Sequence, residues 1–431
     1  MTQQLSSERR RVWAWAMYDW ANSAYATVVL AGFFPILFHD FWHQGAEPAV
    51  INSRLGIANS VASLVVALSA PVLGAIADRS GAKRRFLTAL MMIGLIATGA
   101  LYWVEAGDWL AAATLYALSY VAWLGANVFY DALLVSVARE ERWHFVSGLG
   151  FGLGYLGGGL MYAGCVFAAL SPASFGFADA ASAARFAFVA VAVWWLVFAL
   201  PLLLFVPEPG QSQRLSWAVL PDGFRAVAGT LRRLRGLRMV ALFLIAYWLY
   251  IDGVDTVVVM AVAYGKSLGF ETKHLILALL LVQFIGFPAA IAYGKMGERI
   301  GPKRGIYLAL VVYAAICLWG TQVQAPVEFY VIAVLVGLVQ GGVQSLSRSF
   351  YARLIPPAEA GEFFGFYNLI GRSAALIGPL LFGWFGLAFG SERYSMLSLI
   401  ILFVAGGAVL ALVDEAKGRC DLARDGGAPA A

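Results

Sequence analysis

Six charged residues stand inside stretches of sequence that are otherwise long and apolar. They are four acids and two bases: Asp19, Asp131, Asp252, Asp255, Arg348 and Arg372. A charged side chain that faces lipid is costly, so charges in such stretches almost always face a protein interior, a water-filled cavity or one another. Carboxylates and guanidinium groups placed there can bind polar solutes, carry protons or form ion pairs. These residues are therefore the first candidates for function.

The composition explains why such stretches exist. Hydrophobic residues make up 61% of the 431 and charged residues 13%, which excludes a soluble globular domain and indicates an integral membrane protein. Windows of about 20 apolar residues, long enough to cross a bilayer, predict twelve spans. They run roughly over 12–38, 54–77, 86–105, 109–136, 146–170, 184–206, 238–264, 273–294, 305–324, 328–354, 362–389 and 394–413.

The first span follows Arg9, Arg10 and Arg11, as the apolar core of a secretory signal would. It is too long for a signal, contains Asp19 and lacks a clear small-residue cleavage site, so we expect a retained helix. With an even number of spans both termini lie on one side, and that side holds most of the 30 Lys and Arg residues. The positive-inside rule then predicts cytoplasmic termini. The net charge of +5 reflects topology and contact with anionic membrane lipid rather than binding to nucleic acid.

The longest predicted cytoplasmic connection separates the spans into two sets of six. We expect an N-terminal six-helix bundle over 1–206, a linker over 207–237, a C-terminal six-helix bundle over 238–413 and a cytoplasmic tail over 414–431. The linker has apolar residues at helical spacing among basic ones: Phe224, Val227, Leu231 and Leu234 among Arg225, Arg232, Arg233 and Arg235. This pattern favours a basic amphipathic helix on the inner leaflet, and a plain solvated linker is the alternative.

The two halves share a loop motif. The first copy follows span two and contains Gly74, Asp78, Arg79, Gly81, Lys83 and Arg84; the second follows span eight and contains Gly294, Glu298, Arg299, Gly301, Lys303 and Arg304. Glycine allows a tight turn or a close approach. The acid can interact with the positive N-terminal end of a neighbouring helix, and the bases can anchor the turn at anionic headgroups. Two unrelated basic turns would not need the same spacing of glycine, acid and base, so the match indicates a repeat.

This repeated motif in a twelve-span chain resembles the major facilitator superfamily of transporters. Four further segments are similar to the autophagy-related vacuolar effluxer family and its bacterial relatives: WAMYDWANSAY at 15–25, YIDGVDT at 250–256, GLVQGGVQSLSRS at 337–349 and EFFGFYN at 362–368. The resemblance implies an all-α integral membrane protein whose twelve transmembrane helices form two pseudo-symmetric six-helix bundles. It also implies secondary transport by alternating access. The family's eukaryotic members are associated with amino-acid efflux. The resemblance therefore suggests that this protein exports a small polar solute such as an amino acid.

In the implied fold, spans 1, 4, 7 and 10 line the central cavity. Five of the six intramembrane charges fall on those spans, and Arg372 falls on span 11. Helical rise places Asp19, Asp131 and Arg348 about 7 to 12 Å from the cytoplasmic ends, Arg372 about 15 Å, and Asp252 with Asp255 about 20 to 25 Å. Because four acids face two bases, we expect one acid to hold a proton in part of the cycle or to meet a cationic substrate group.

The roles of these residues remain open at this point. Arg348 or Arg372 can receive a carboxylate, and Asp252 or Asp255 can meet an ammonium group or carry a coupling proton. Asp19 with Arg348 can equally form a gating or packing ion pair, and Asp131 can be a helix-end residue that binds Arg139 or Arg142. Neutral residues that could bind substrate or bridge helices are Tyr18, Asn22, Tyr25, Asn127, Gln283, Gln340, Gln344 and Asn368.

Span five is rich in glycine. Its segment 152–157, GLGYLG, matches a dinucleotide-binding fingerprint in form, but no strand precedes it, so that interpretation is rejected. We expect Gly150, Gly154 and Gly158 to form a ridge of small residues that packs closely on the other half and permits rocking.

Other functions are weakly supported. The four histidines, His39, His43, His144 and His274, lie in or next to loops and form no metal or nucleophile motif, so we expect neither an enzyme nor a cofactor. The three cysteines require no disulfide. No Walker-type phosphate loop is present, so a gradient must drive transport, and protons are the first candidate. We expect a monomer. A multidrug, peptide or lipid exporter and a non-transporting receptor are the alternatives.

Overall fold

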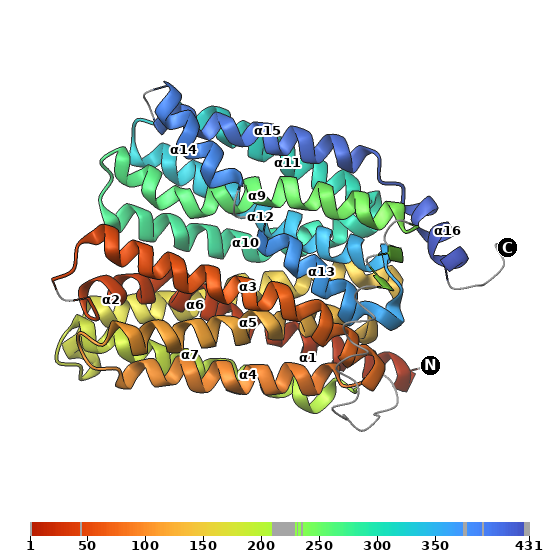
Figure 1. Ribbon diagram of the computed structural model, residues 1–431, viewed down its shortest axis with the longest axis horizontal. Helices are drawn as coiled ribbons and strands as arrows, with labels where there is room; N and C mark the ends of the chain where they lie inside the picture. The colour runs from red at the N-terminus through yellow and green to blue at the C-terminus, as the bar shows by residue number, and fades with distance from the viewer. Residues whose placement is uncertain are drawn as a thin grey trace.

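A computed structural model describes residues 2–43, 45–208, 229–230, 232–233, 236–373, 377–389 and 392–425. Over these residues the chain is helical and contains no strand. The helices lie roughly parallel in two groups (Figure 1), which we call the first half (2–208) and the second half (236–425). Both chain ends emerge at one end of the bundle, here called the terminal end; the other is called the opposite end (Figure 1).

The first half contains seven α-helices: α1 (Thr2–Ala24), α2 (Phe34–Asp40), α3 (Pro48–Ser80), α4 (Lys83–Ala100), α5 (Trp109–Val137), α6 (Trp143–Leu170) and α7 (Ala180–Phe205). A π-helical segment, η1 (Tyr25–Phe33), joins α1 to α2, so these three elements form one span. Short 3-10 turns are η2 (Leu101–Trp103), η3 (Glu140–Arg142) and η4 (Pro172–Phe175). The wide turns of η1 face the centre of the molecule, a placement often found at functional sites.

The second half contains α9 (Arg238–Ser267), α10 (Thr272–Ile300), α11 (Pro302–Gly320), α12 (Pro326–Leu354), α13 (Ala360–Ser373), α14 (Ile377–Phe389), α15 (Glu392–Ala411) and α16 (Glu415–Asp425). The 3-10 turn η5 (Pro357–Glu359) precedes α13. Among the described residues, eleven helical segments are long and apolar enough to cross a membrane. The one remaining predicted span, span 11 over 362–389, contains α13 and α14, and residues 374–376 between them lie outside the described residues.

Helix boundaries follow local chemistry. Asp108 caps α5 by accepting a hydrogen bond from the Ala111 backbone N–H at 3.1 Å. Asp179 caps α7 through the Ser182 backbone N–H at 2.7 Å, and this bond holds the pKa of the Asp179 carboxyl below its usual range. Gly81 ends α3 with a left-handed φ of 59°, a conformation that glycine adopts without strain.

Two predictions about the chain outside the bundles need comment. The apolar residues proposed for a linker helix, Phe224, Val227, Leu231 and Leu234, lie outside the described residues. The predicted tail, by contrast, contains a helix that the sequence analysis did not predict. This helix, α16, packs Gly418 against Leu354 and Met239, and Glu415 forms an ion pair with Arg353 at 3.0 Å.

The glycine ridge of α6 faces a different partner from the one predicted. A Cβ atom on Gly154 would lie 2.6 Å from the Ser23 side chain of α1, and Gly150 and Gly158 also pack on α1, so the predicted ridge lies within the first half. A second set of α6 glycines meets α10 of the second half: Gly148, Gly152 and Gly159. The prediction was right about close packing and wrong about the face, because α6 carries glycine on both sides.

Candidate functional site

A cavity of about 790 Å³ lies between the two halves. Its charged and amide-bearing lining residues are Asp19, Asn22, Asn127, Asp131, Asp255, Lys266, Gln283, Gln340, Gln344, Arg348 and Asn368. The lining also includes Ile36 and Lys266, which are exposed at the opposite end. At the terminal end the lining finishes at Arg348, which is 2% exposed. The cavity is therefore open toward the opposite end and closed toward the terminal end.

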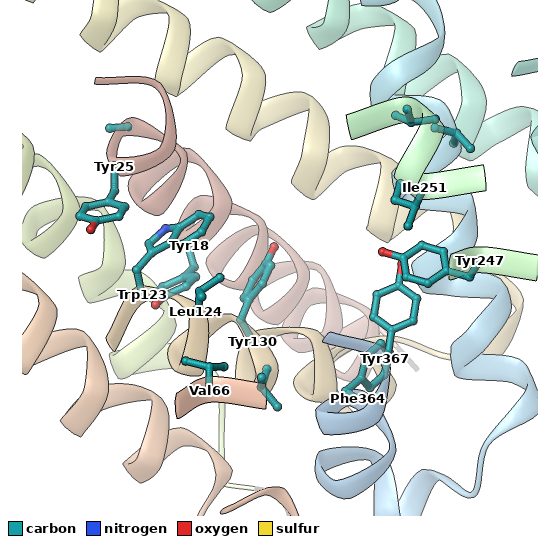
Figure 2. Packing of buried hydrophobic residues seen from close by; sticks show 14 of the residues in the cluster. Tyr18, Tyr25, Val66, Trp123, Leu124, Tyr130, Tyr247, Ile251, Phe364 and Tyr367 are labelled. Atoms are coloured by element: carbon teal, nitrogen blue, oxygen red, sulfur yellow. The ribbon is translucent and has the colours of Figure 1, made fainter. Parts of the chain in front are cut away.

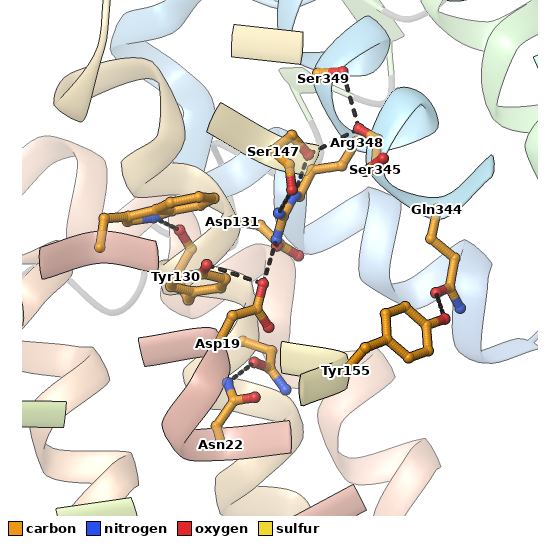
Figure 3. A network of polar contacts seen from close by, with 12 residues as sticks. Asp19, Asn22, Tyr130, Asp131, Ser147, Tyr155, Gln344, Ser345, Arg348 and Ser349 are labelled. Atoms are coloured by element: carbon orange, nitrogen blue, oxygen red, sulfur yellow. Dashed lines mark hydrogen bonds and ion pairs between the residues drawn. The ribbon is translucent and has the colours of Figure 1, made fainter. Parts of the chain in front are cut away.

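Arg348 on α12 closes the cavity floor by binding residues of the first half (Figure 3). Its Nη1 donates to Asp131 Oδ1 of α5 at 3.0 Å. Its Nε donates to Ser147 Oγ of α6 at 2.9 Å and its Nη2 to the Ser147 carbonyl at 3.0 Å. A buried guanidinium is tolerated when its donors are satisfied in this way. All three nitrogen atoms of Arg348 are thus engaged in holding the halves together.

Aromatic rings surround the same guanidinium. It lies 4.9 Å from the Trp15 ring and 4.3 Å from the Phe151 ring. Trp15 in turn stacks on Tyr130 with ring centroids 4.4 Å apart. Cation–π attraction strengthens in a site without water, so these rings add to the stability of the closed floor.

Asp19 and Asp131 both face Arg348, but they lie at different distances from its guanidinium. Asp19 lies 3.7 Å from the Arg348 guanidinium and accepts a hydrogen bond from the Tyr130 hydroxyl at 3.0 Å. Asp131 makes the shorter contact with Arg348 and also accepts from Asn368 Nδ2 of α13 at 3.1 Å. The alternative that paired Asp131 with Arg139 or Arg142 is wrong. Arg139 instead pairs with Glu8 at 3.3 Å.

Further bonds join the halves near the floor. Ser147 Oγ donates to the Ser345 carbonyl at 2.8 Å, and the His144 ring lies 2.7 Å from Ser349 Oγ. His144 and Ser349 are fully buried. The terminal end is thus closed by a buried polar network whose bonds join α5 and α6 of the first half to α12 and α13 of the second.

The first loop motif lies at the same end. The Asp78 carboxylate accepts the backbone N–H groups of Gly361 and Glu362, at 3.0 and 2.8 Å, at the N-terminus of α13. This is the helix-end contact predicted for the acid. Gly74 lets the two helices meet, since a Cβ atom there would lie 2.2 Å from the Gly361 carbonyl oxygen.

For Lys83 and Arg84 the predicted anchoring of the turn at lipid headgroups is wrong; for Arg79, which is exposed, it stays a prediction. Lys83 is 4% exposed and pairs with Asp78 at 2.7 Å. Arg84 donates to the carbonyls of Leu203 and Val206 at the end of α7. These bases therefore bind the negative C-terminal end of a helix or the motif's own acid.

The second copy repeats this arrangement in the other half. Glu298 lies near the backbone N–H of Phe145 at the start of α6. Lys303 donates to the carbonyls of Ala411 and Val413, each at 2.8 Å, at the end of α15. The headgroup prediction is wrong for Lys303 as well. Each half thus presents a motif acid to the first turn of a helix in the other half.

Asp252 and Asp255, the two acids predicted to lie farthest from the cytoplasmic ends, occupy different environments. Asp252 is 1% exposed and is not among the residues that line the cavity. Its carboxylate accepts the backbone N–H groups of Ile377 and Gly378 at 3.0 Å and so caps α14. Asp255 lines the cavity. The expectation of a cavity role for Asp252 is corrected, because its carboxylate is bound by the backbone N–H groups of the first residues of α14.

Two tyrosines of the first span are also buried rather than cavity-lining (Figure 2). The Tyr25 hydroxyl bonds Ser119 Oγ at 2.7 Å, and the Tyr18 ring packs against the Tyr130 ring at 5.0 Å. Asn22 does face the cavity and donates to Asn127 at 2.6 Å. Arg372 falls in the last turn of α13, and its side chain is outside the described residues.

Three residues of the site were not predicted: Tyr130, Ser147 and Tyr155. Tyr155 lines the cavity, and its hydroxyl donates to Gln344 Oε1 at 3.1 Å (Figure 3). It shares one face of α6 with Gly148 and Gly152, at spacings of seven and three residues, and that periodicity would have placed it at the α10 interface. Ser147 carried no comparable signal, since serine is common in transmembrane helices.

Solved structures with the same arrangement define the fold. The human organic anion transporter MFSD10 superposes with a TM-score of 0.70 over 94% of this chain and 99% of that chain, at 17% identity. The proton:xylose symporter XylE gives 0.72 over 96% of each chain, at 14% identity. A bacterial homologue of ferroportin in its outward-facing state gives 0.65 over 94% and 99%, at 13% identity. The chain therefore has the twelve-helix major facilitator fold.

Sequence comparison defines the family. The family model described as Vacuole effluxer Atg22 like matches residues 49–423. An uncharacterized MFS-type transporter, YxiO of Bacillus subtilis, is 36% identical over 93% of this chain and 94% of its own length. Autophagy-related protein 22 of Coccidioides immitis is 29% identical over 67% of this chain, which spans about half, 51%, of that longer protein. The chain belongs to the Atg22-like vacuole effluxer family, and it is a transporter of the major facilitator type rather than an enzyme.

Proposed function

We propose that this transporter exports a small polar solute such as an amino acid by alternating access and uses the proton gradient. The observation that carries the proposal is the cavity itself, which is lined by carboxylates and amides, open at one end and closed at the other by a buried polar network. Efflux is favoured over uptake because the matching family model is named for effluxers. Proton coupling draws support from the cavity acid Asp255.

An amino acid brings one ammonium and one carboxylate group into the cavity. Asp255 is the acid proposed to meet the ammonium group or to carry the coupling proton. Arg348 is a poor receptor for the carboxylate in this conformation, since its three nitrogen atoms already donate to Asp131 and Ser147. Amide donors such as Gln340 and Gln344 can take that role, and Arg372 stays a candidate.

We also propose a setting for the protein. The charge bias of the loops supports cytoplasmic termini in a cytoplasmic (inner) membrane. The terminal end is then the cytoplasmic side, and the described conformation is outward-open. We propose that the protein acts as a monomer, because the cavity is complete within one chain.

A ligand screen followed by reconstituted transport tests the proposal. The twenty amino acids are first screened by thermal shift of the purified protein, because a ligand that binds only the native state raises its melting temperature. The amino acid with the largest shift is then used for flux in liposomes with and without a pH gradient. No shift with any amino acid would contradict the amino-acid proposal and favour the drug, peptide or lipid exporters.

Asp255→Asn and Asp252→Asn form a matched pair for the coupling role. We expect Asp255→Asn to abolish the effect of the pH gradient on flux. Asp252→Asn should lower the melting temperature, because the α14 cap is weakened, while the pH dependence of the remaining flux persists. Unchanged coupling in Asp255→Asn would reject Asp255 as the proton carrier.

A further inference from the structure

Tyr155 fits its ring into a slot formed by two glycines of the other half. Its ring lies between α10 and α12: a Cβ atom on Gly286 would lie 2.9 Å from Tyr155 Cδ1, and one on Gly341 would lie 2.7 Å from Tyr155 Cε2. Both added atoms would also lie 3.3 Å from Tyr155 Cδ2, so the ring packs directly against both glycines. The slot exists only because both positions lack a side chain.

The hydroxyl of the same side chain is held at the end of this slot. It donates to Gln344 Oε1 at 3.1 Å, and Gln344 stands one helical turn before Arg348 on α12 (Figure 3). On α6, Tyr155 stands eight residues after Ser147, or about 12 Å along the helix. The two helices are thus joined at two levels, by Ser147 with Arg348 at the floor and by Tyr155 with Gln344 in the cavity wall.

We infer that Tyr155 is a positioning residue that links the cavity to the movement of the two halves. When the terminal end opens, α6 must shift against α10 and α12, and a ring packed directly on a glycine of each helix cannot follow that shift without leaving the slot. Seating of Tyr155 therefore favours the conformation that is closed at the terminal end. Because Tyr155 and Gln344 also line the cavity, a solute that competes for the Gln344 carbonyl weakens the same contact. This inference rests on the alternating access of the proposed function.

The experiment measures the distance between two spin labels across the open mouth of the cavity, at Ile36→Cys of α2 and Ile276→Cys of α10. Both positions line the cavity. Cys420 is exposed and is replaced by serine, whereas Cys165 and Cys317 are buried and stay. No ligand is added. A short distance reports a closed mouth and a long distance an open one.

Gly341→Ala is the main variant. Its methyl group enters the slot, so we expect the ratio of short to long mouth distances to rise on the order of tenfold. Tyr155→Ala should raise the ratio as well. The double variant should give the same ratio as Tyr155→Ala alone, because the methyl group then meets no ring and its other close neighbour, Ala290 Cβ at 2.9 Å, belongs to the same half. Tyr155→Phe keeps the ring seated and should give a smaller rise.

Gly164→Ala is the matched control, because it adds the same methyl group on α6, the helix of Tyr155, with no atom within 4 Å of it. It should leave the ratio as in the unsubstituted protein. If Gly341→Ala and Tyr155→Ala both leave the ratio unchanged while Asp131→Ala raises it, Tyr155 has no positioning role and alternating access stands. If no variant changes the distance, the proposed alternating access itself fails. Additive effects in the double variant would also overturn the slot mechanism.

Discussion

At the terminal end the two halves meet through buried polar bonds, whereas at the opposite end the cavity wall is mainly apolar. The cross-half bonds at the terminal end include Arg348 to Asp131 and Ser147 to the Ser345 carbonyl. The wall near the mouth consists of Pro35, Ile36, Leu275, Ile276, Phe329, Ile332 and Met396, with Lys266 among them. Hydrogen bonds are directional and are lost over small displacements, while apolar contact is not directional.

This difference gives the two ends different mechanical properties. The terminal end can be tightly closed or fully released, because a half-broken buried network leaves charges without partners. The opposite end can close by bringing apolar surfaces together without a specific partner for each group. Each prediction below is measured by the mouth distance between labels at positions 36 and 276 or by the melting temperature.

Asp131→Ala should have the largest effect on the conformational equilibrium. It leaves the buried Arg348 guanidinium with its bonds to Ser147 and with Asp19, 3.7 Å away, as its acid partner, and loss of a buried ion-pair partner costs roughly 3 to 5 kcal/mol. Water reaches Arg348 when the terminal end opens, so the population should move to the closed-mouth state. Asp40→Ala, which removes an exposed acid, is the control. An unchanged mouth distance in Asp131→Ala would show that the network does not hold the terminal end.

Asp78→Asn tests the first loop motif. It removes the charge from the α13 N-terminus and leaves buried Lys83 without its acid, so we expect a shift toward the closed mouth of about 2 kcal/mol. Glu298→Gln is the corresponding change in the second copy. Because Glu298 is more exposed to solvent, its effect should be smaller. Equal effects would mean that the two motif copies contribute equally.

Gly154→Ala separates contacts within a half from contacts between halves. The added methyl group would lie 2.6 Å from Ser23 Oγ of α1, and overpacking costs about 1 to 3 kcal/mol. We expect a lower melting temperature with the mouth distance unchanged, since α1 and α6 belong to the same half. A shift in the mouth distance comparable to that of Gly341→Ala would contradict the division of α6 into two glycine faces.

Arg419→Gln should have the smallest effect. Arg419 of α16 pairs with Glu140 of the first half on the exposed surface, and surface ion pairs contribute about 0 to 1 kcal/mol. We expect little change in either the mouth distance or the melting temperature. A shift as large as that of Asp78→Asn would instead identify α16 as a strap that closes the terminal end.

Much of the fold could be predicted from the sequence, because a membrane imposes long apolar helices and the loop motif repeats at a fixed offset. The charges at Asp19, Asp131, Asp255 and Arg348 were found for the same reason, since each is costly outside a cavity or an ion pair. Asp131 was given the wrong alternative partner because Arg348 is distant in sequence, and only the meeting of α5 with α12 brings them together.

Other features depend on side-chain direction, which helical spacing left ambiguous. Tyr18 and Tyr25 share the helix of Asp19 and Asn22, yet they point into the first half. Asp252 stands three residues from Asp255 and binds the backbone N–H groups at the start of α14, which no pattern in its own helix indicates. Tyr155 was passed over because its slot is formed by glycines on two other helices, which no local pattern connects to it.

The central claim is that the Arg348 network holds the terminal end closed and that its release exchanges the open ends of the cavity. The most direct test is Arg348→Ala with two label pairs measured separately: 36 with 276 at the mouth, and Glu141→Cys with Ala358→Cys at the terminal end, both of which are exposed. We expect Arg348→Ala to shorten the mouth distance and to lengthen the distance between the labels at positions 141 and 358. A folded Arg348→Ala protein in which both distances match those of the unsubstituted protein would contradict it.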